Sequence, residues 1–355
     1  MKQIGVFFGG VSSEHEVSLL SASAVLQNID PEKYEVHRVC ITKEGEWFYF
    51  TGDNGRIADG SCFFDREHLI PCTINVNRTA RGLLLFGKEG TKTIRLDCVF
   101  PVLHGKNGED GTMQGLLEIA GIPYVGCDTL ASAVCMDKTM THTVLDRNGI
   151  ETAKYLTIMD YEYAENGEEF LELAEKELHY PMFVKPANAG SSVGITKVND
   201  RDGFHEAMQI AFDNDRKVLV EEMITGLEVE CGVLGNKEPI AAVPGSIAPC
   251  NEWYDYEAKY LAGQTKTVIP AAISSRMIDR VRAQAVRAYL ALGCTGMARV
   301  DFFVTPQERL LVNEVNTIPG FTSISMYAKM FAAAGVNFSE LVDRLLVLAL
   351  NAKGE

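Results

Sequence analysis

The chain has 355 residues, enough for two or three domains, and its 33 basic and 48 acidic side chains give a formal net charge of −15. This balance argues against a general nucleic-acid binder, because phosphate backbones are gripped by an excess of Lys and Arg, and against docking on anionic lipid. It does not exclude a small phosphorylated ligand whose charge is met locally. Hydrophobic residues make up 46% and charged residues 23% of the chain, as in an ordinary globular protein with a sizeable core.

The cysteines and the first residues favour a cytoplasmic protein. The nine cysteines are odd in number and include no CxxC pair, which indicates reduced thiols. The opening MKQIGVFFGG resembles a buried strand that ends at Gly9, since the apolar part of a secretory signal would be longer. Because no stretch approaches the ~18 apolar residues of a membrane span, we expect no membrane insertion.

The first third of the sequence alternates between strand and helix patterns. Apolar runs predict buried strands at residues 4–8, 34–42 and 97–103. A capping box of Ser13 and Glu16 predicts a helix after the first strand, and a second helix is expected at 112–120. This alternation indicates a parallel α/β unit whose ligands lie at the strand C-termini, with an antiparallel excursion at residues 45–95.

The pattern changes after Gly126. Predicted elements are a helical stretch at 128–148, strands at 182–186, 194–198 and 217–222, a helix capped by Ser274 or Ser275, two strands at 298–305 and 309–316, and a last helix opened by Ser339. Leu341, Val342, Leu345 and Leu346 are expected to face inward on that last helix.

The most specific candidate site lies on the hairpin at 298–316. Glu314 and Asn316 are two residues apart on a strand, so they project from one face. A turn centred near Pro306 would place Arg299 opposite Glu314, with Asp301 as a diagonal neighbour. Three hard oxygen ligands, Asp301, Glu314 and Asn316, would suit Mg²⁺ shared with substrate phosphates. The alternative is an Arg299–Glu314 pair on a solvated sheet face, but the polar Gly/Pro-turned loop that follows favours the metal site.

A second candidate is the loop NAGSSVG at residues 188–194. Its glycines let backbone N–H groups approach a phosphate, Ser191 and Ser192 add hydroxyl donors, and Lys185 lies on the strand before it. The alternative is a plain hairpin loop. Neither GxxxxGK[ST] nor GxGxxG occurs, so a P-loop protein and a Rossmann dehydrogenase both lack their main support.

Polar residues at strand ends add weaker candidates. Glu16 fits the capping role, whereas no such role is predicted for Glu14, whose side chain could face the crevice beyond the first strand. His104 follows another strand end in a polar loop, where a ligand role competes with an ordinary structural one. Glu221 and Glu228, at the exit of a strand, would accept hydrogen bonds from an adenine amine and a ribose hydroxyl, or else lie exposed.

Two further features each have an ordinary structural interpretation as the alternative to a functional one. Lys138 begins or extends a helix, where a solvated lysine is the default. The segment EWYDYEAKY at residues 252–260 has four aromatic and four charged side chains. It is typical of a loop that covers a substrate, and its alternative is an edge strand.

Taken together, these strings resemble the D-alanine–D-alanine ligases of the ATP-grasp superfamily. The matching segments are FFGGVSSEHEVSLLSA, PVLHGKNGEDGTMQG, GIPYVGCDTLASAVCMDK, KPANAGSSVGITKV, EWYDYEAKY, ARVDFF and NEVNTIPGFTSISM, which extend over residues 7–326. The resemblance implies an α/β fold with an N-terminal parallel domain and an α+β ATP-grasp part, divided as 1–126, 127–216 and 217–355. It also implies a homodimer.

The resemblance implies a reaction and its substrate contacts. One D-alanine carboxylate attacks the γ-phosphate of ATP, and the amine of a second D-alanine then attacks the acyl phosphate, giving D-alanyl-D-alanine for peptidoglycan precursors. Glu14 would hold the first ammonium group with His104 beside it. Glu14, Ser191 and Tyr260 would tie three loops together, and Ser325 would hold the second carboxylate.

The same resemblance assigns the remaining contacts. Those to ATP would come from Lys138, Lys185, Ser191, Ser192, Glu221, Glu228 and Lys259. Asp301, Glu314 and Asn316 would bind two Mg²⁺ ions, for which Mn²⁺ is a substitute. Arg299 and the backbone N–H of Gly320 would form the oxyanion hole.

The second substrate is a choice between relatives. The covering loop contains no histidine, unlike that of the lactate-using vancomycin-resistance ligases, which argues against depsipeptide formation. Met326 follows the TSxS serine as an apolar wall suited to a methyl group, where many resistance-type ligases resemble one another in having arginine. We expect D-alanine, with D-serine as the alternative and a non-catalytic nucleotide-binding regulator as a remote one.

Overall fold

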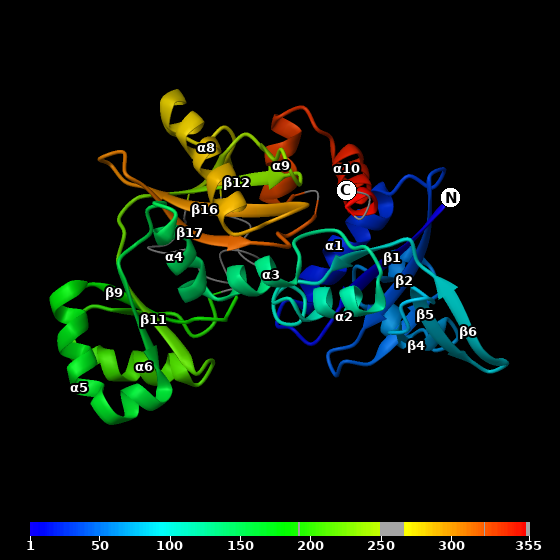
Figure 1. The fold of residues 1–355 in the computed structure, drawn as a ribbon, viewed down its shortest axis with the longest axis horizontal. Coiled ribbons are helices and arrows are strands. Elements are labelled where there is room, and N and C mark those ends of the chain that lie inside the picture. Colours follow the sequence, from blue (N-terminus) through cyan, green and yellow to red (C-terminus); the bar gives the residue numbers. More distant parts are fainter. Residues whose placement is uncertain (191, 249–265, 323, 353–355) are drawn as a thin grey trace.

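The computed structural model describes residues 1–190, 192–248, 266–322 and 324–352 (Figure 1). The described residues form three sheets with helices packed against them. Ser191, Lys259, Tyr260 and the segment 252–260, all named above as candidates, lie outside the described residues. No helix among the described residues has the length and apolar character that crossing a membrane requires.

The N-terminal part is a seven-stranded sheet with the order β6-β5-β4-β3-β2-β1-β7. Its strands are β1 (Lys2–Gly9), β2 (Tyr34–Ile41), β3 (Trp47–Phe50), β4 (Leu69–Asn75), β5 (Gly82–Gly87), β6 (Gly90–Arg95) and β7 (Cys98–Val102). β1 pairs in parallel with β2 and β7, and β3 to β6 pair antiparallel. The parallel unit and the antiparallel excursion are therefore both confirmed.

Two helices, α1 (His15–Asn28) and α2 (Thr112–Ala120), belong to this part, together with the short 3-10 turns η1 (Asn54–Arg56) and η2 (Ser61–Phe64). The predicted capping box of α1 is wrong. The N-cap is Glu14, whose side chain makes no capping hydrogen bond. Glu16 is therefore the second residue of the helix, whereas a capping box needs its glutamate at the third. The side chain of Glu16 pairs instead with Lys43.

A four-stranded sheet follows, with the order β10-β9-β11-β8. It comprises β8 (Tyr155–Met159), β9 (Met182–Pro186), β10 (Thr196–Val198) and β11 (Lys217–Glu222), with helices α5 (Asp160–Glu177) and α6 (Phe204–Phe212) and the turn η3 (Arg201–Gly203). The predicted helical stretch 128–148 is two helices, α3 (Thr129–Met136) and α4 (Lys138–Arg147). They divide at Asp137, which has extended backbone and whose carboxylate caps α4 by accepting a hydrogen bond from Met140 N.

The C-terminal sheet has six strands, ordered β15-β14-β12-β16-β17 with β13 paired to β12. Its elements are β12 (Leu227–Leu234), β13 (Ile240–Ala241), β14 (Gly245–Ala248), β15 (Lys266–Val268), α8 (Ser275–Ala291), β16 (Met297–Val304), β17 (Leu310–Asn316), α9 (Met326–Ala333) and α10 (Phe338–Asn351). The capping prediction for Ser274 is confirmed. The prediction for Ser339 is wrong, because the side chain of Asn337 caps α10 by accepting from Glu340 N.

The hydrophobic cores do not follow the chain order. One core joins Val6 and Phe100 of the N-terminal sheet to Phe321, Tyr327 and Leu345 of the C-terminal segment. A second joins α3 and α4 to α8, β12, β16 and β17. The four-stranded sheet has a core of its own with α5 and α6. Figure 1 shows the result, with α10 beside α1 and the four-stranded sheet set apart from both.

Candidate active site

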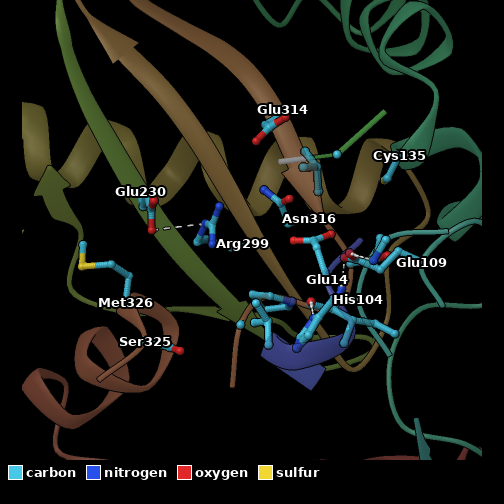
Figure 2. Close-up of a pocket in the computed structure, with 18 of the residues that line it drawn as sticks. Glu14, His104, Glu109, Cys135, Glu230, Arg299, Glu314, Asn316, Ser325 and Met326 are labelled. Carbon is cyan, nitrogen blue, oxygen red and sulfur yellow. Dashed lines mark hydrogen bonds and ion pairs between the residues drawn. The ribbon is translucent and has the colours of Figure 1, made fainter. Parts of the chain in front are cut away.

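A cavity of about 440 Å³ opens where the loops after β1 and β7 meet the β16–β17 hairpin and the start of α9 (Figure 2). Predicted site residues that line it are Glu14, His104, Lys138, Arg299, Glu314, Asn316, Gly320, Ser325 and Met326. Residues up to 312 positions apart in sequence therefore meet around one space. Lys185, Ser192, Glu221, Glu228 and Asp301 are described but do not line it.

The β16–β17 hairpin has a different register from the predicted one. Asp301 lies opposite Glu314, and Arg299 lies opposite Asn316. The strands are joined by a five-residue loop rather than a tight turn at Pro306, with Thr305 N donating to Arg309 O at 3.0 Å. The predicted pairing of Arg299 with Glu314 is therefore wrong, because the residue opposite Arg299 lies two positions further along β17.

A β-bulge next to Asp301 keeps the polar residues on one face despite this shift. The register between Phe302 and Val312 would, if continued, pair Asp301 with Asn313 and turn Glu314 to the opposite face. The extra residue of the bulge restores the alternation, so that the carboxylates of Asp301 and Glu314 share a face. The bulge is thus the local feature that assembles the candidate site.

Arg299 is held by carboxylates on two strands. Its Nε and Nη2 donate to Asp301 Oδ1 and Oδ2, both at 2.7 Å, and Nε lies 3.2 Å from Glu230 Oε2 on β12. Burial alone would lower the pKa of Arg299, but Asp301 and Glu230 outweigh it and raise that pKa well above the usual value. Nη1 makes no hydrogen bond within the described part of the chain, so this nitrogen remains available to a substrate.

The donor chemistry of this face fits a hard divalent cation. Glu314 and Asn316 line the cavity, and Asn316 Nδ2 donates to Asp301 Oδ2 at 2.9 Å, which leaves the amide oxygen of Asn316 for a cation. Asp301 already accepts two hydrogen bonds from Arg299, so it would share its oxygens between the arginine and a metal. Among the described residues no group of three His, Cys, Asp or Glu side chains could hold a metal ion. The predicted set combines two carboxylates with the amide oxygen of Asn316, all of them hard oxygen donors.

Glu14 lies at the junction of three loops. A Cβ built on Gly105 would stand 2.8 Å from Glu14 Oε2, and one built on Gly190 would stand 3.3 Å from the same oxygen. Gly105 has φ +69°, which also disfavours any side chain there. The carboxylate of Glu14 therefore lies against the loop after β7 and the glycine-serine loop, as a residue that joins them would.

His104 is buried and uses both ring nitrogens within the protein. Nδ1 lies 2.9 Å from Ile318 O, and Nε2 lies 3.0 Å from Ser21 Oγ. Because a carbonyl only accepts, Nδ1 carries the proton and the serine hydroxyl donates to Nε2. Burial lowers the pKa of His104, which favours this neutral form.

Three of the residues predicted to contact ATP, Lys138, Lys185 and Glu221, take part in ion pairs. Lys185 pairs with Glu221, and His142 Nε2 lies 3.4 Å from the other oxygen of that carboxylate. Burial raises the pKa of Glu221, but Lys185 and His142 outweigh it, and the net effect lowers that pKa. Lys138 Nζ donates to Ala189 O at 2.8 Å and lies 3.9 Å from Glu314, so it links the glycine-serine loop to the hairpin.

The remaining predicted residues are placed less decisively. Glu228 lies on the same face of β12 as Glu230 and is partly exposed. Ser192 is also partly exposed and has φ +61°. Ser325 Oγ accepts a hydrogen bond from Thr322 N at 2.9 Å, and Gly320 lies close enough that an added Cβ would approach this oxygen to 3.3 Å.

Two acidic residues of the site were missed by the sequence analysis. Glu109 lines the cavity, and its carboxylate accepts hydrogen bonds from Gly105 N and Ile318 N, both at 2.8 Å. Burial, and after it the charge of Glu14, raises the pKa of Glu109 to about 8. The other is Glu230, the second partner of Arg299. Strand alternation from Glu228 would have found Glu230, and the position of Glu109 in the polar loop after β7 pointed to the same crevice as His104.

Comparison with known proteins gives consistent matches over the whole chain. The family models described as D-ala D-ala ligase N-terminus and D-ala D-ala ligase C-terminus match residues 3–127 and 144–347. A D-alanine–D-alanine ligase from Clostridium acetobutylicum is 47% identical over 98% of this chain and 98% of its own length. One from Acetivibrio thermocellus is 46% identical over 98% of this chain and 96% of its own.

Solved structures agree in fold. The crystal structure of the VanG D-Ala:D-Ser ligase from Enterococcus faecalis has a TM-score of 0.90 and 44% identity, covering 98% of this chain and 99% of that one. The D-alanine–D-alanine ligase from Coxiella burnetii has a TM-score of 0.88 and 35% identity, covering 99% and 95%.

Proposed function

The chain belongs to the D-alanine–D-alanine ligase family, and on this premise we propose that it joins two D-alanine molecules into D-alanyl-D-alanine at the expense of ATP. The product serves peptidoglycan precursor synthesis. The observation that carries the proposal is the meeting of Arg299, Glu314, Asn316 and Lys138 around one cavity, on a chain that matches such ligases over nearly its full length.

The first step brings two anions together. The carboxylate of the first D-alanine attacks the γ-phosphate of ATP, giving an acyl phosphate and ADP. Lys138 and Lys185, with Lys259 outside the described residues, would offset the phosphate charge, and the Ser191–Ser192 loop would donate hydrogen bonds. Glu221 and Glu228 would take the adenine and ribose. Glu14 would hold the ammonium of the same D-alanine, with Tyr260 and Ser191 as its predicted partners.

Divalent metal would be held by Asp301, Glu314 and Asn316. Bound there, Mg²⁺ supplies positive charge that lowers the repulsion between substrate carboxylate and phosphate. The proposal keeps two ions, with Mn²⁺ as a substitute. The residues themselves contribute orientation, because Asp301 and Glu314 are fixed opposite each other by the bulged register.

The second step needs an oxyanion hole. The amine of the second D-alanine attacks the acyl carbonyl, and negative charge develops on the carbonyl oxygen before phosphate leaves. Arg299 Nη1 and the backbone N–H of Gly320 would receive that charge. Because Asp301 and Glu230 hold the other guanidinium nitrogens, Arg299 needs little reorganisation as the charge forms. Ser325 would bind the second carboxylate.

The choice of D-alanine as second substrate rests on Met326. Its side chain lines the cavity beside Ser325, and a Cβ built on Gly245 would lie 2.3 Å from Met326 Cε. Ile269 Cγ1 lies 3.0 Å from the same built Cβ, so the surroundings of Met326 are apolar and suit a methyl group. An apolar pocket rejects an added hydroxyl only weakly, so we expect some reaction with D-serine as well.

D-serine as the main second substrate is the alternative proposal. Its support is the similarity to the VanG D-Ala:D-Ser ligase, at 44% identity. The D-alanine–D-alanine ligases from Clostridium acetobutylicum and Acetivibrio thermocellus are similar to the chain at 47% and 46% identity, and the apolar Met326 also favours D-alanine.

The deciding experiment measures phosphate release from ATP with D-alanine alone and with D-alanine plus D-serine or D-lactate, and identifies products by mass spectrometry. We expect release with D-alanine alone and D-alanyl-D-alanine as the main product in the mixtures. A dominant D-alanyl-D-serine product would select the alternative. Absence of release under every condition would favour the remote alternative, a non-catalytic nucleotide-binding regulator.

Three coarser features complete the proposal. The division into 1–126, 127–216 and 217–355 stays a proposal about segments of the sequence. Two of the hydrophobic cores contain residues from more than one of these segments. A homodimer and a cytoplasmic location likewise stay predictions. The free, buried state of the eight described cysteines supports the second of these.

A further inference from the structure

The backbone between β17 and α9 is held from outside by residues of the N-terminal part. Residues 317–321 of this backbone have no regular structure. Ile318 O accepts from His104 Nδ1 at 2.9 Å, and Ile318 N donates to Glu109 Oε1 at 2.8 Å. Phe321 N donates to Ser21 Oγ at 3.2 Å. Both backbone polar groups of Ile318 are therefore used by side chains more than 200 positions away in sequence.

These contacts form one connected network. Ser21 Oγ accepts from Phe321 N and donates to His104 Nε2 at 3.0 Å, while His104 donates to Ile318. The second carboxylate oxygen of Glu109 accepts from Gly105 N at 2.8 Å, which ties Glu109 to the residue after His104. Ser21 and His104 are buried, so the three hydrogen bonds that involve them are made away from water and cost more to leave unmade.

The held positions bracket Gly320. Ile318 lies two residues before it, and Phe321 directly after it. A peptide N–H keeps one direction only when the chain on both sides is fixed, and a glycine does not fix it alone because its own backbone is permissive. Asn316, two residues before Ile318, lies at the end of β17, where the strand holds it. The network thus fixes the irregular stretch that carries Gly320, directly after the strand that carries Asn316.

We propose that Glu109 and His104 are positioning residues that clamp Ile318 and thereby aim the Gly320 N–H into the oxyanion site. The inference rests on the proposed function, since the aim matters only if a carbonyl oxygen develops charge there. Neither side chain needs to touch the reacting atoms. Both ring nitrogens of His104 already make hydrogen bonds within the protein, and both carboxylate oxygens of Glu109 accept from backbone N–H groups.

This assignment differs from a purely structural role in what it predicts. A structural residue would change stability and leave turnover per folded molecule unchanged. A substrate ligand would raise KM for D-alanine. A positioning residue for the oxyanion hole lowers kcat with little change in KM, because the hydrogen bond that it aims strengthens in the transition state.

The test uses Glu109→Gln in the full chain. The kinetics are measured at pH 9, above the pKa of about 8, where both carboxylate oxygens of Glu109 accept from backbone N–H groups. Glutamine keeps the size of the side chain and can accept from one backbone N–H, but its amide nitrogen then faces the other N–H, so one half of the clamp is lost. We expect kcat to fall by about 10-fold to 100-fold, the scale of a displacement of ~1 Å at a reacting centre, with KM for D-alanine within about 3-fold. Glu44→Gln, an exposed glutamate outside the site, is the matched control.

A second measurement does not depend on activity. Hydrogen exchange followed by mass spectrometry should show faster exchange of the amides at 316–321 in Glu109→Gln than in the wild type or in Glu44→Gln, while peptides of the four-stranded sheet stay unchanged. If Glu109→Gln does not fold, Ser21→Ala carries the same two measurements, because it removes only the acceptor of Phe321 N and the donor to His104.

The outcomes separate the two proposals. Unchanged kcat in a folded Glu109→Gln protein, or a rise in KM with kcat unchanged, overturns the positioning role, and so does unchanged exchange at 316–321. If the wild type releases no phosphate with D-alanine while exchange at 316–321 responds as expected, the clamp stands as a structural feature, and both the proposed function and its catalytic use are rejected.

Discussion

Arg299 offers its substrate one nitrogen out of three, because Asp301 and Glu230 hold the rest. Arg299→Ala removes the oxyanion donor, and losing such a donor typically costs ~3 to 4 kcal/mol, so we expect turnover to fall by at least about two decades. The measurement is kcat for phosphate release with saturating D-alanine. Near-normal turnover would remove Arg299 from this role.

The same substitution leaves two carboxylates without their shared cation, so it needs a control for folding. Removing one partner of a buried ion pair costs about 3 to 5 kcal/mol. Arg299→Lys keeps the charge and loses the bidentate geometry toward Asp301, and we expect it to be more stable than Arg299→Ala and still strongly impaired. Circular dichroism melts of both variants show whether the rate was measured on folded protein.

Glu314 tests the metal proposal. Glu314→Gln keeps the shape of the side chain and removes one of two anionic oxygen donors on the bulged face, so we expect activity to require several-fold more Mg²⁺. The readout is the half-saturating Mg²⁺ concentration at fixed ATP. An unchanged titration would exclude Glu314 from the metal set, whatever the effect on the maximal rate.

Glu109 gives a prediction about pH and stability. Its pKa of about 8 in the folded state lies above the usual 4.5, through burial and the charge of Glu14, with the N–H groups of Gly105 and Ile318 and then Arg299 acting in the opposite direction. The folded state then binds more protons than the unfolded state between about pH 4.5 and 8. This group therefore lowers the free energy of unfolding as pH rises through that window, and has no such effect below it.

The measurement is the urea midpoint of the wild type and of Glu109→Gln at pH 5, 6.5 and 8. Because the neutral side chain cannot ionise, the difference between the two midpoints should shift in favour of the variant as pH rises. Burial lowers the pKa of His104, whose ring contacts the same residue Ile318, so this ring stays neutral across the upper part of the range. A difference that stays constant from pH 5 to 8 contradicts the raised pKa.

At the scale of elements, α10 shows where a cap can be tested without touching the site. The side chain of Asn337 accepts from Glu340 N at 3.0 Å, whereas Ser339 lies inside the helix and donates to Asn28 Oδ1. We expect Asn337→Ala to lower the free energy of unfolding by about 1 kcal/mol and to leave kcat unchanged. Ser339→Ala is the matched control and should cost less. Equal losses would contradict the assigned cap.

The hairpin and the helix starts show what sequence reasoning reaches at this scale. Apolar periodicity found the strands β9, β11, β16 and β17 within a residue or two, because burial imposes the alternation directly. Register was missed, since a five-residue loop and a bulge each add a residue and neither has a strong local signal. Caps were missed at α1 and α10 because two or three adjacent polar residues compete for one position.

The site was predictable as a set of residues and less so as a set of contacts. Of the fourteen named residues that the structure describes, nine line the cavity, because strand ends and polar loops concentrate there. Partners such as Glu109 to Ile318 and Glu230 to Arg299 join residues far apart in sequence. Spacing along the chain contains no information about such pairs, so only the folded structure reveals them.

For the whole molecule, the shared core of the two chain ends leads to a prediction about fragments. Tyr34 donates to Asp343 of α10 at 2.9 Å, and Leu341 and Leu345 of the same helix are fully buried in the core that contains Phe100. A fragment of residues 1–126 would expose that surface. We expect it to bind a hydrophobic dye and to lack a cooperative thermal transition, unlike the full chain. A sharp transition in the isolated fragment would contradict the shared core.

The shared core of the two chain ends also has a consequence for folding during translation. The strands β1 and β7 leave the ribosome early, but α9 and α10, which complete their core, come last. At ~5 to 20 residues per second, the interval between residue 126 and residue 349 is roughly 10 to 45 s. Throughout that time the apolar face of the nascent N-terminal sheet lacks the part of its cover that α9 and α10 provide. A growing chain of this protein is therefore a natural client for a chaperone that shields exposed apolar surface until translation ends.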